Sequence, residues 1–256
     1  MLDRFAYTSM TGAKHAMGQL ATTTNNLANT QTPGFREMFT AFRSVPVDGP
    51  GADTRAFVVD STPGADFTQG TIQTTGNPLD VAIKNAQGFF AVRRPDGTEA
   101  YTRSGRFTLD QDGILRLGKN EVLGQVDRIS IPVEARNIEI SQDGTVSTQF
   151  VGSTAFDEAS KTPFEEIEKL RLVNVDPKLL VRGEDGLFSY GGLELPDTDP
   201  NLRVQQGAVE LSNVNPTTAM VQMIEQNRMF DLNMRLIQTA DQNAKSANSL
   251  MSLSRG

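Results

Sequence analysis

Few side chains in this sequence are suited to chemistry, and those few are poorly placed for it. Cysteine is absent, which excludes thiol nucleophiles, disulfides and thiolate metal sites. The single histidine, His15, has no second histidine for a metal site and no Asp or Glu one helical turn away for a catalytic triad. We therefore expect His15 to have a surface or interaction role.

The acidic stretches do not match calcium-binding or catalytic sites either. Residues 110–113 read DQDG and begin like a calcium loop, but Ile114 occupies the next ligand position and the glycine comes too early. The run EEIE at residues 165–168 is typical of solvated charges. No phosphate-binding loop, dinucleotide fingerprint or nucleophile elbow is present. We expect no enzyme, no cofactor, no metal and no small-molecule substrate; a hydrolase with a dispersed carboxylate site is an alternative.

Charge and hydropathy exclude further classes of protein. The net charge is −7, from 24 basic and 31 acidic residues, without the basic stripe of a nucleic-acid binder. No run of about 18 apolar residues predicts a transmembrane helix. Charged and polar residues interrupt residues 1–20, so we expect no cleaved Sec signal peptide.

The positions of the prolines predict the order of the elements. All 12 prolines lie between Pro33 and Pro216, and proline breaks helices by removing a donor and clashing with the preceding turn. We therefore expect an α+β fold in which long N- and C-terminal helices pack together and flank a β-rich antiparallel middle domain.

Both ends carry apolar residues three and four apart, which predicts a narrow helical stripe. The two stripes consist of Met10, Ala13, Met17, Leu20, Thr24 and Leu27, and of Met220, Met223, Asn227, Phe230, Met234, Ile237, Asp241, Ala244, Asn248 and Met251. Their polar members favour a crowded bundle over an isolated dimeric zipper. An ordinary helix pair that covers the core of its own domain is the alternative.

Short alternating runs between the two ends predict strands. They lie at residues 80–83, 89–92, 106–109, 114–117, 138–146, 168–175 and 186–190. The turn at residues 110–113 is expected to join the strands at 106–109 and 114–117 into a hairpin. Residues 33–56 and 196–215 are expected to be extended. The predicted parts are 1–35 with 214–256 as a helical assembly domain, 36–75 with 196–213 as an extended connector, and 76–195 as a β-rich outer domain.

Three blocks in order carry a resemblance to a known family. The first is TNNLANTQTPGF at residues 24–35. The second is TGNPLDVAI at 75–83, followed by GFF at 88–90 and YTRSGRF at 101–107. The third is QGAVELSNVNP at 206–216. Together they are similar to the signature of flagellar basal-body rod and hook proteins. The opening DRFAYTSMTGA at 3–13 and the run VEARNIEI at 133–140 resemble the proximal-rod type within that family.

The resemblance implies a structural subunit of the bacterial flagellar rod, which helps to form the drive shaft between motor and hook. The implied partners are other rod proteins, copies of itself and the flagellar type III export apparatus, with no nucleic acid. The implied location is the basal body, in the periplasmic space. A distal rod protein of the same family and a soluble β-rich binding module with self-packed end helices are the alternatives.

The terminal helices would then form the assembly interface. The residues expected there are Met10, Ala13, Met17, Leu20, Asn25, Asn26, Leu27, Ala28, Asn29, Pro33, Gly34, Phe35, Met220, Met223, Ile224, Asn227, Phe230, Met234, Ile237, Ala244 and Met251.

Overall fold

The computed structural model describes residues 2–46, 56–132, 134–150, 164–192 and 194–253. The chain forms two compact units, one made of Met1–Thr30, Glu37–Asp66 and Val214–Gly256, the other of Gln31–Arg36 and Phe67–Asn213. We call them the helical unit and the β unit. Their bounds differ from the three parts expected from the sequence, which stay a prediction.

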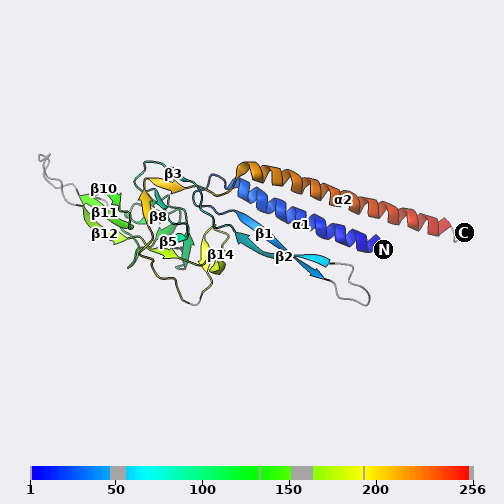
Figure 1. Cartoon of the computed structure of the whole chain (residues 1–256), viewed down its shortest axis with the longest axis horizontal. Coiled ribbons are helices and arrows are strands. Elements are labelled where there is room, and N and C mark those ends of the chain that lie inside the picture. Colours follow the sequence, from blue (N-terminus) through cyan, green and yellow to red (C-terminus); the bar gives the residue numbers. More distant parts are fainter. Residues whose placement is uncertain (1, 47–55, 133, 151–163, 193, 254–256) are drawn as a thin grey trace. The chain divides into compact units, whose positions relative to one another are not determined.

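The helical unit contains both ends of the chain. Helix α1 (Leu2–Ala28) and helix α2 (Pro216–Leu253) lie antiparallel and side by side (Figure 1). A hairpin of β1 (Met38–Pro46) and β2 (Ala56–Ala65) packs against α1. Among the described residues, neither helix is long and apolar enough to cross a membrane. The predicted packing of the terminal helices on each other is confirmed.

The β unit is antiparallel in every pairing that the structure describes, as predicted. Its largest sheet has the order β14-β15-β6-β5-β9-β8-β7, with β13 also paired to β5. These strands are β5 (Gly88–Arg93), β6 (Glu99–Thr102), β7 (Thr108–Leu109), β8 (Leu115–Leu117), β9 (Asn120–Val122), β13 (Leu172–Asn174), β14 (Leu180–Arg182) and β15 (Phe188–Tyr190).

Smaller sheets complete the β unit. Three strands follow the order β10 (Ala135–Ile140), β11 (Thr145–Phe150) and β12 (Glu165–Lys169). Two further pairs join distant segments: β16 (Val204–Gln206) with β4 (Val81–Ile83), and β17 (Ala208–Glu210) with β3 (Ile72–Thr74). A short 3-10 helix, η1, spans Pro177–Leu179. The core consists mainly of aliphatic and aromatic side chains from these sheets, among them Val81, Ile83, Phe90, Val92, Phe107, Leu115, Val122, Ile129, Leu170 and Val204.

The sequence predicted the local strands better than the distant pairings. The hairpin around residues 110–113 is confirmed as β7 and β8, and strands occur in each of the other predicted runs. The described parts of residues 33–56 and 196–215, expected to be extended connectors, hold β1, β16 and β17. These strands pair with segments that do not adjoin them in the sequence, which no local pattern reveals. Residues 47–55 of the first connector lie outside the described residues.

Candidate functional site

The stripe of α2 that packs in the helical unit mixes small side chains with larger ones. Its buried or half-buried residues recur every three or four positions: Ala219, Met223, Gln226, Phe230, Asn233, Ile237, Ala240 and Ala244. Helix α1 buries Ser9, Ala13, Ala16, Thr23 and Asn26. The helices approach closely, because a Cβ added to Gly12 would lie 2.8 Å from Oδ1 of Asn233.

Along each predicted stripe, packed residues therefore alternate with exposed ones. Ala13, Met223, Phe230 and Ile237 lie on the packed stripe, but several of its other positions belong to the small residues directly before Met10, Met17 and Met220. The small residues face inward because they permit the close approach of the helices. As a result Met17 is 62% exposed and Ile224 53% exposed. Met10, Met220 and Met234 are likewise exposed.

The remaining predicted interface residues occupy varied surroundings. Leu20, Leu27, Asn29, Pro33 and Ala244 are half-buried; Asn25, Ala28 and Asn227 are exposed; Asn26, Gly34 and Phe35 are buried. The side chain of Met251 lies outside the described part of the structure. The role of the whole set in assembly stays a prediction.

The asparagine motif has a visible role within the helical unit. The side-chain amide of Asn26 donates to the carbonyl of Met38 at 2.7 Å, and its Oδ1 accepts from the Met38 amide at 2.9 Å. One side chain thus satisfies both backbone groups at the start of β1. His15 packs edge-on against Phe42 of the same strand, with ring centroids 5.5 Å apart. Helix α1 therefore positions the hairpin through its own side chains.

Helix α2 begins with a capping residue. Oδ1 of Asn215 accepts from the amides of Thr217 at 3.0 Å and Thr218 at 3.3 Å, as an N-cap side chain does. Pro216 occupies the first helical position, where its missing donor does no harm. The helix therefore starts at Pro216.

Three charged residues form a fully buried cluster in the β unit, which we call the ion triad: Arg36, Arg103 and Glu210. Arg36 Nη1 lies 2.7 Å from Glu210 Oε1, and Arg103 Nη2 lies 2.5 Å from Glu210 Oε2, all three side chains being inaccessible to solvent. Arg103 Nε donates a second bond to the same Oε2 at 2.9 Å. The Gly70 amide donates to Oε1 at 2.9 Å. Glu210 is thus the centre of the cluster.

The two arginines of the triad are satisfied very differently. Arg103 also donates to the carbonyls of Ile83, Asn85 and Gly88, so its guanidinium is surrounded by acceptors. Burial lowers the pKa of the Arg103 guanidinium, and the Glu210 carboxylate opposes that change. For Arg36, none of the three guanidinium nitrogens has a hydrogen-bond acceptor among the described residues, and its contact with Glu210 is an ion pair alone.

The backbone around Arg36 is packed tightly into the β unit. Gly34 has φ of 69°, and a Cβ there would lie 2.2 Å from the amide nitrogen of Ser104, so no other residue fits. The Gly34 amide donates to the Glu210 carbonyl at 2.8 Å. Arg182 lies 4.3 Å from the ring centroid of Phe35 and donates to the Arg36 carbonyl at 2.9 Å.

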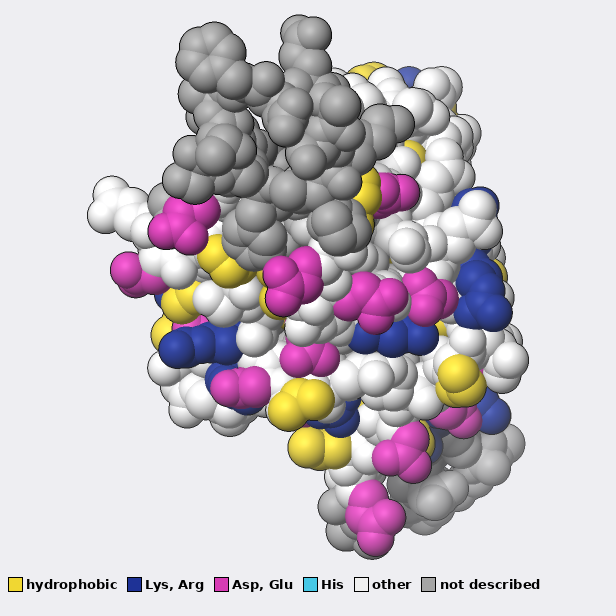
Figure 2. Space-filling view, turned by 90° about the vertical axis from the view of Figure 1, so that its left-hand side faces the viewer, with side chains coloured by type: hydrophobic (Ala, Val, Ile, Leu, Met, Phe, Trp, Pro, Cys, Tyr) yellow, Lys and Arg dark blue, Asp and Glu magenta, His cyan; other side chains and the backbone are white. Residues whose placement is uncertain are grey.

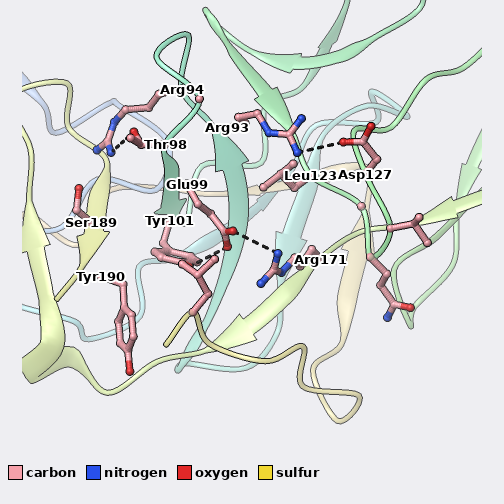
Figure 3. Close-up of a pocket in the computed structure, with 15 residues that line it drawn as sticks. Arg93, Arg94, Thr98, Glu99, Tyr101, Leu123, Asp127, Arg171, Ser189 and Tyr190 are labelled. Atoms are coloured by element: carbon pink, nitrogen blue, oxygen red, sulfur yellow. Dashed lines mark hydrogen bonds and ion pairs between the residues drawn. The ribbon is translucent and has the colours of Figure 1, made fainter. Parts of the chain in front are cut away.

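The β unit also has a cavity of about 550 Å³, whose charged side chains are already paired (Figure 3). Arg171 binds Glu99 at 3.2 Å, and Tyr101 donates to Glu99 at 2.8 Å. Burial, reinforced by Glu99, raises the pKa of Tyr101 far above its ordinary value. A phenol held neutral and a carboxylate held by an arginine make a poor general acid or base.

The acidic turn at residues 110–113 holds its hairpin together. Asp110 Oδ1 accepts from the amides of Asp112 and Ile114, and Arg116 donates to Oδ2 at 2.6 Å. The hydrogen bond from Arg116 is the main cause that lowers the pKa of Asp110. Among the described residues, no three or more His, Asp or Glu side chains gather where they could hold a metal ion.

Two members of the ion triad could have been recognised in the sequence, because each is a charged residue within or next to an apolar run. Glu210 interrupts the apolar run AVEL, and Arg103 follows the buried strand β6 directly. A charge inside an apolar run predicts a buried partner. Arg36 follows the buried Phe35, but no local pattern connects it with Glu210, which lies near the other end of the chain.

Comparisons with known proteins agree along the whole chain. Residues 7–36 match the family model described as flagella basal body rod protein, 82–148 the flagellar hook protein FlgE/F/G D1 domain, and 205–250 the flagellar basal body rod FlgEFG protein C-terminal. The flagellar basal-body rod protein FlgF of Escherichia coli (strain K12) is 39% identical over 99% of this chain and 100% of its own length. The chain belongs to the flagellar basal-body rod protein family.

Other relatives support this membership. FlgF of Salmonella typhimurium is 38% identical over 99% of this chain, and the rod protein FlgG of Buchnera aphidicola subsp. Schizaphis graminum is 32% identical over 91% of it. The resemblance to flagellar rod proteins, and to the FlgF type among them, is confirmed. The chain is a structural subunit of the flagellar basal-body rod. Each matched segment contributes one residue of the ion triad: Arg36, Arg103 and Glu210.

Proposed function

We propose that this rod subunit belongs to the proximal part of the rod and joins its neighbours through the terminal helices. The observation that carries the proposal is the apolar surface of α2. Among the side chains of this helix that the structure describes, seven large apolar ones are exposed: Met220, Val221, Ile224, Met229, Leu232, Met234 and Leu236. Many large apolar side chains exposed on one helix indicate an interaction surface.

The exposed residues occupy both flanks of the stripe that faces α1. With 100° per residue, Met220, Ile224 and Met234 fall on one flank, and Val221, Leu232 and Leu236 on the other. A helix that is apolar beyond its packed stripe needs neighbours on more than one side. We therefore infer that α2 is enclosed by other subunits, either copies of this chain or other rod proteins.

The surface of the β unit supports an outer position for that unit. Figure 2 shows a face on which Lys and Arg side chains alternate with Asp and Glu, while the apolar side chains are scattered. Such a mixed surface is typical of contact with solvent. We infer that residues 1–35 with 214–256 act as the assembly domain and residues 76–195 as the outer domain.

The proposal also covers the export route of the protein and its non-enzymatic role. We infer export through the flagellar type III apparatus, without a cleaved signal peptide, to the part of the rod in the periplasmic space. The role is non-enzymatic and needs no cofactor, small-molecule substrate or nucleic acid. The paired charges of the cavity support the non-enzymatic role, and the 39% identity to FlgF of Escherichia coli over the full length of both chains supports the proximal assignment.

The proposal is tested by complementing a strain that lacks this protein and counting the protein in isolated basal bodies by quantitative mass spectrometry. Ile224→Asp puts a charge on an exposed flank, so we expect loss of incorporation and motility with unchanged unfolding of the free protein. The matched control is Gln222→Asp, an exposed polar residue of the same helix turn. Absence of the wild-type chain from basal bodies, or equal incorporation of Ile224→Asp, would contradict the proposal.

A further inference from the structure

The β unit ties together the two segments through which the chain leaves it for the terminal helices. Residues 31–36 follow α1, and residues 211–213 precede α2. The Gly34 amide donates to the Glu210 carbonyl at 2.8 Å, and the Asn213 amide donates to the Phe35 carbonyl at 3.4 Å. The two exits therefore lie side by side within one unit.

Glu210 needs only one arginine to be neutralised. Arg103 supplies that charge with two N–H groups on Oε2, and its other N–H groups reach backbone carbonyls. Arg36 adds a second buried positive charge, which lies 2.7 Å from Glu210 Oε1 as an ion pair but makes no side-chain hydrogen bond of good geometry among the described residues. A buried charge with unsatisfied donors destabilises a fold, and apolar residues of similar volume are often as stabilising or more so.

The stability of the β unit therefore does not explain why a charged residue occupies position 36. Its ion pair does have a positional consequence, because it joins the exit segment of α1 to the last residue of β17, directly before the exit segment of α2. An ion pair confined to one buried geometry fixes the relative position of the segments that carry its charges, which is a recognised use of buried polar groups.

We propose that Arg36 is a positioning residue for rod assembly, which holds both exits of the β unit in the one arrangement that lets the terminal helices pack with neighbouring subunits. This inference rests on the proposed assembly function. It predicts that assembly and stability separate at this residue: replacing Arg36 by an apolar residue impairs assembly while the isolated protein stays as stable as before or becomes more stable.

The test compares Arg36→Met with wild type, with Arg36→Lys, which keeps the charge, and with Arg93→Met. Arg93 is a matched control because its ion pair with Asp127 is partly exposed and involves neither exit segment. Three quantities are measured for each full-length protein: the midpoint of thermal unfolding, amide exchange of residues 34–36 and 211–213, and the amount in isolated basal bodies from complemented cells.

For Arg36→Met we expect an unchanged or higher unfolding midpoint, exchange at the two exits that is about tenfold faster, and incorporation that falls by about tenfold, as loss of roughly 1.4 kcal/mol would give. Arg36→Lys should recover most of the incorporation, and Arg93→Met should match wild type. Normal incorporation of Arg36→Met would overturn the proposal. A lower unfolding midpoint would overturn it too, because Arg36 would then be a structural residue. Absence of the wild-type protein from basal bodies would instead refute the assembly function itself.

Discussion

Replacing Glu210 by glutamine removes the only negative charge of the ion triad while keeping nearly the same shape. In the wild type, two guanidinium groups bind this carboxylate, and none of the three side chains is exposed to solvent. After Glu210→Gln, both positive charges stay buried without a counter-charge. Breaking a buried ion pair from one side costs about 3–5 kcal/mol, and the complete burial of the triad leaves no solvent screening to reduce that figure.

This loss is a large part of the stability of a domain, which is about 5–15 kcal/mol. With a urea dependence of about 2 kcal/mol per M, the unfolding midpoint of the β unit should fall by about 2 M. Pulsed hydrogen exchange with mass spectrometry across a urea series measures it, because peptides from residues 67–213 report on the β unit separately from the helices.

Two further variants make the test specific. Asp127→Asn breaks an ion pair in which Asp127 is 63% exposed, so solvent screening should make its effect much smaller than that of Glu210→Gln. The double variant Glu210→Gln with Arg36→Met leaves one unpaired guanidinium instead of two, so it should recover part of the lost stability. A midpoint for Glu210→Gln within 0.5 M (roughly 1 kcal/mol) of wild type would refute the electrostatic account of the triad.

Three more variants test individual contacts. Asn215→Ala removes the N-cap of α2 and should destabilise the helical unit by about 1 kcal/mol in thermal unfolding, whereas retention of wild-type stability would count against the cap. Asn26→Ala leaves both Met38 backbone groups without their partner and should speed amide exchange at the start of β1, while the exposed Asn25→Ala should not; equal effects would contradict the role of Asn26. Burial, with a smaller contribution from Asp66, raises the pKa of Glu37, so the folded state holds its proton more tightly and loses stability as the pH rises through that pKa. Glu37→Gln should therefore unfold at a higher temperature than wild type at pH 7 and at the same temperature below about pH 4; a difference independent of pH would show that another interaction is responsible.

The sequence by itself determined the order of the elements and the family. The prolines confined the long helices to the two ends, because a proline inside a helix removes a donor and clashes with the turn before it. The turn DQDG predicted the hairpin of β7 and β8 because its residues favour a tight reversal. These signals are local, and local backbone chemistry is enough to produce them.

Only the tertiary structure decided which side of each helix is packed and how the motifs meet. Spacing alone could not choose between Met17 and its small neighbour Ala16, because both lie near the same stripe; the close approach of α1 and α2 selects the smaller side chain. Nor does any local pattern join Arg36 to Glu210. Their pairing depends on two chain segments that meet only in the folded β unit, where burial makes each charge depend on the other.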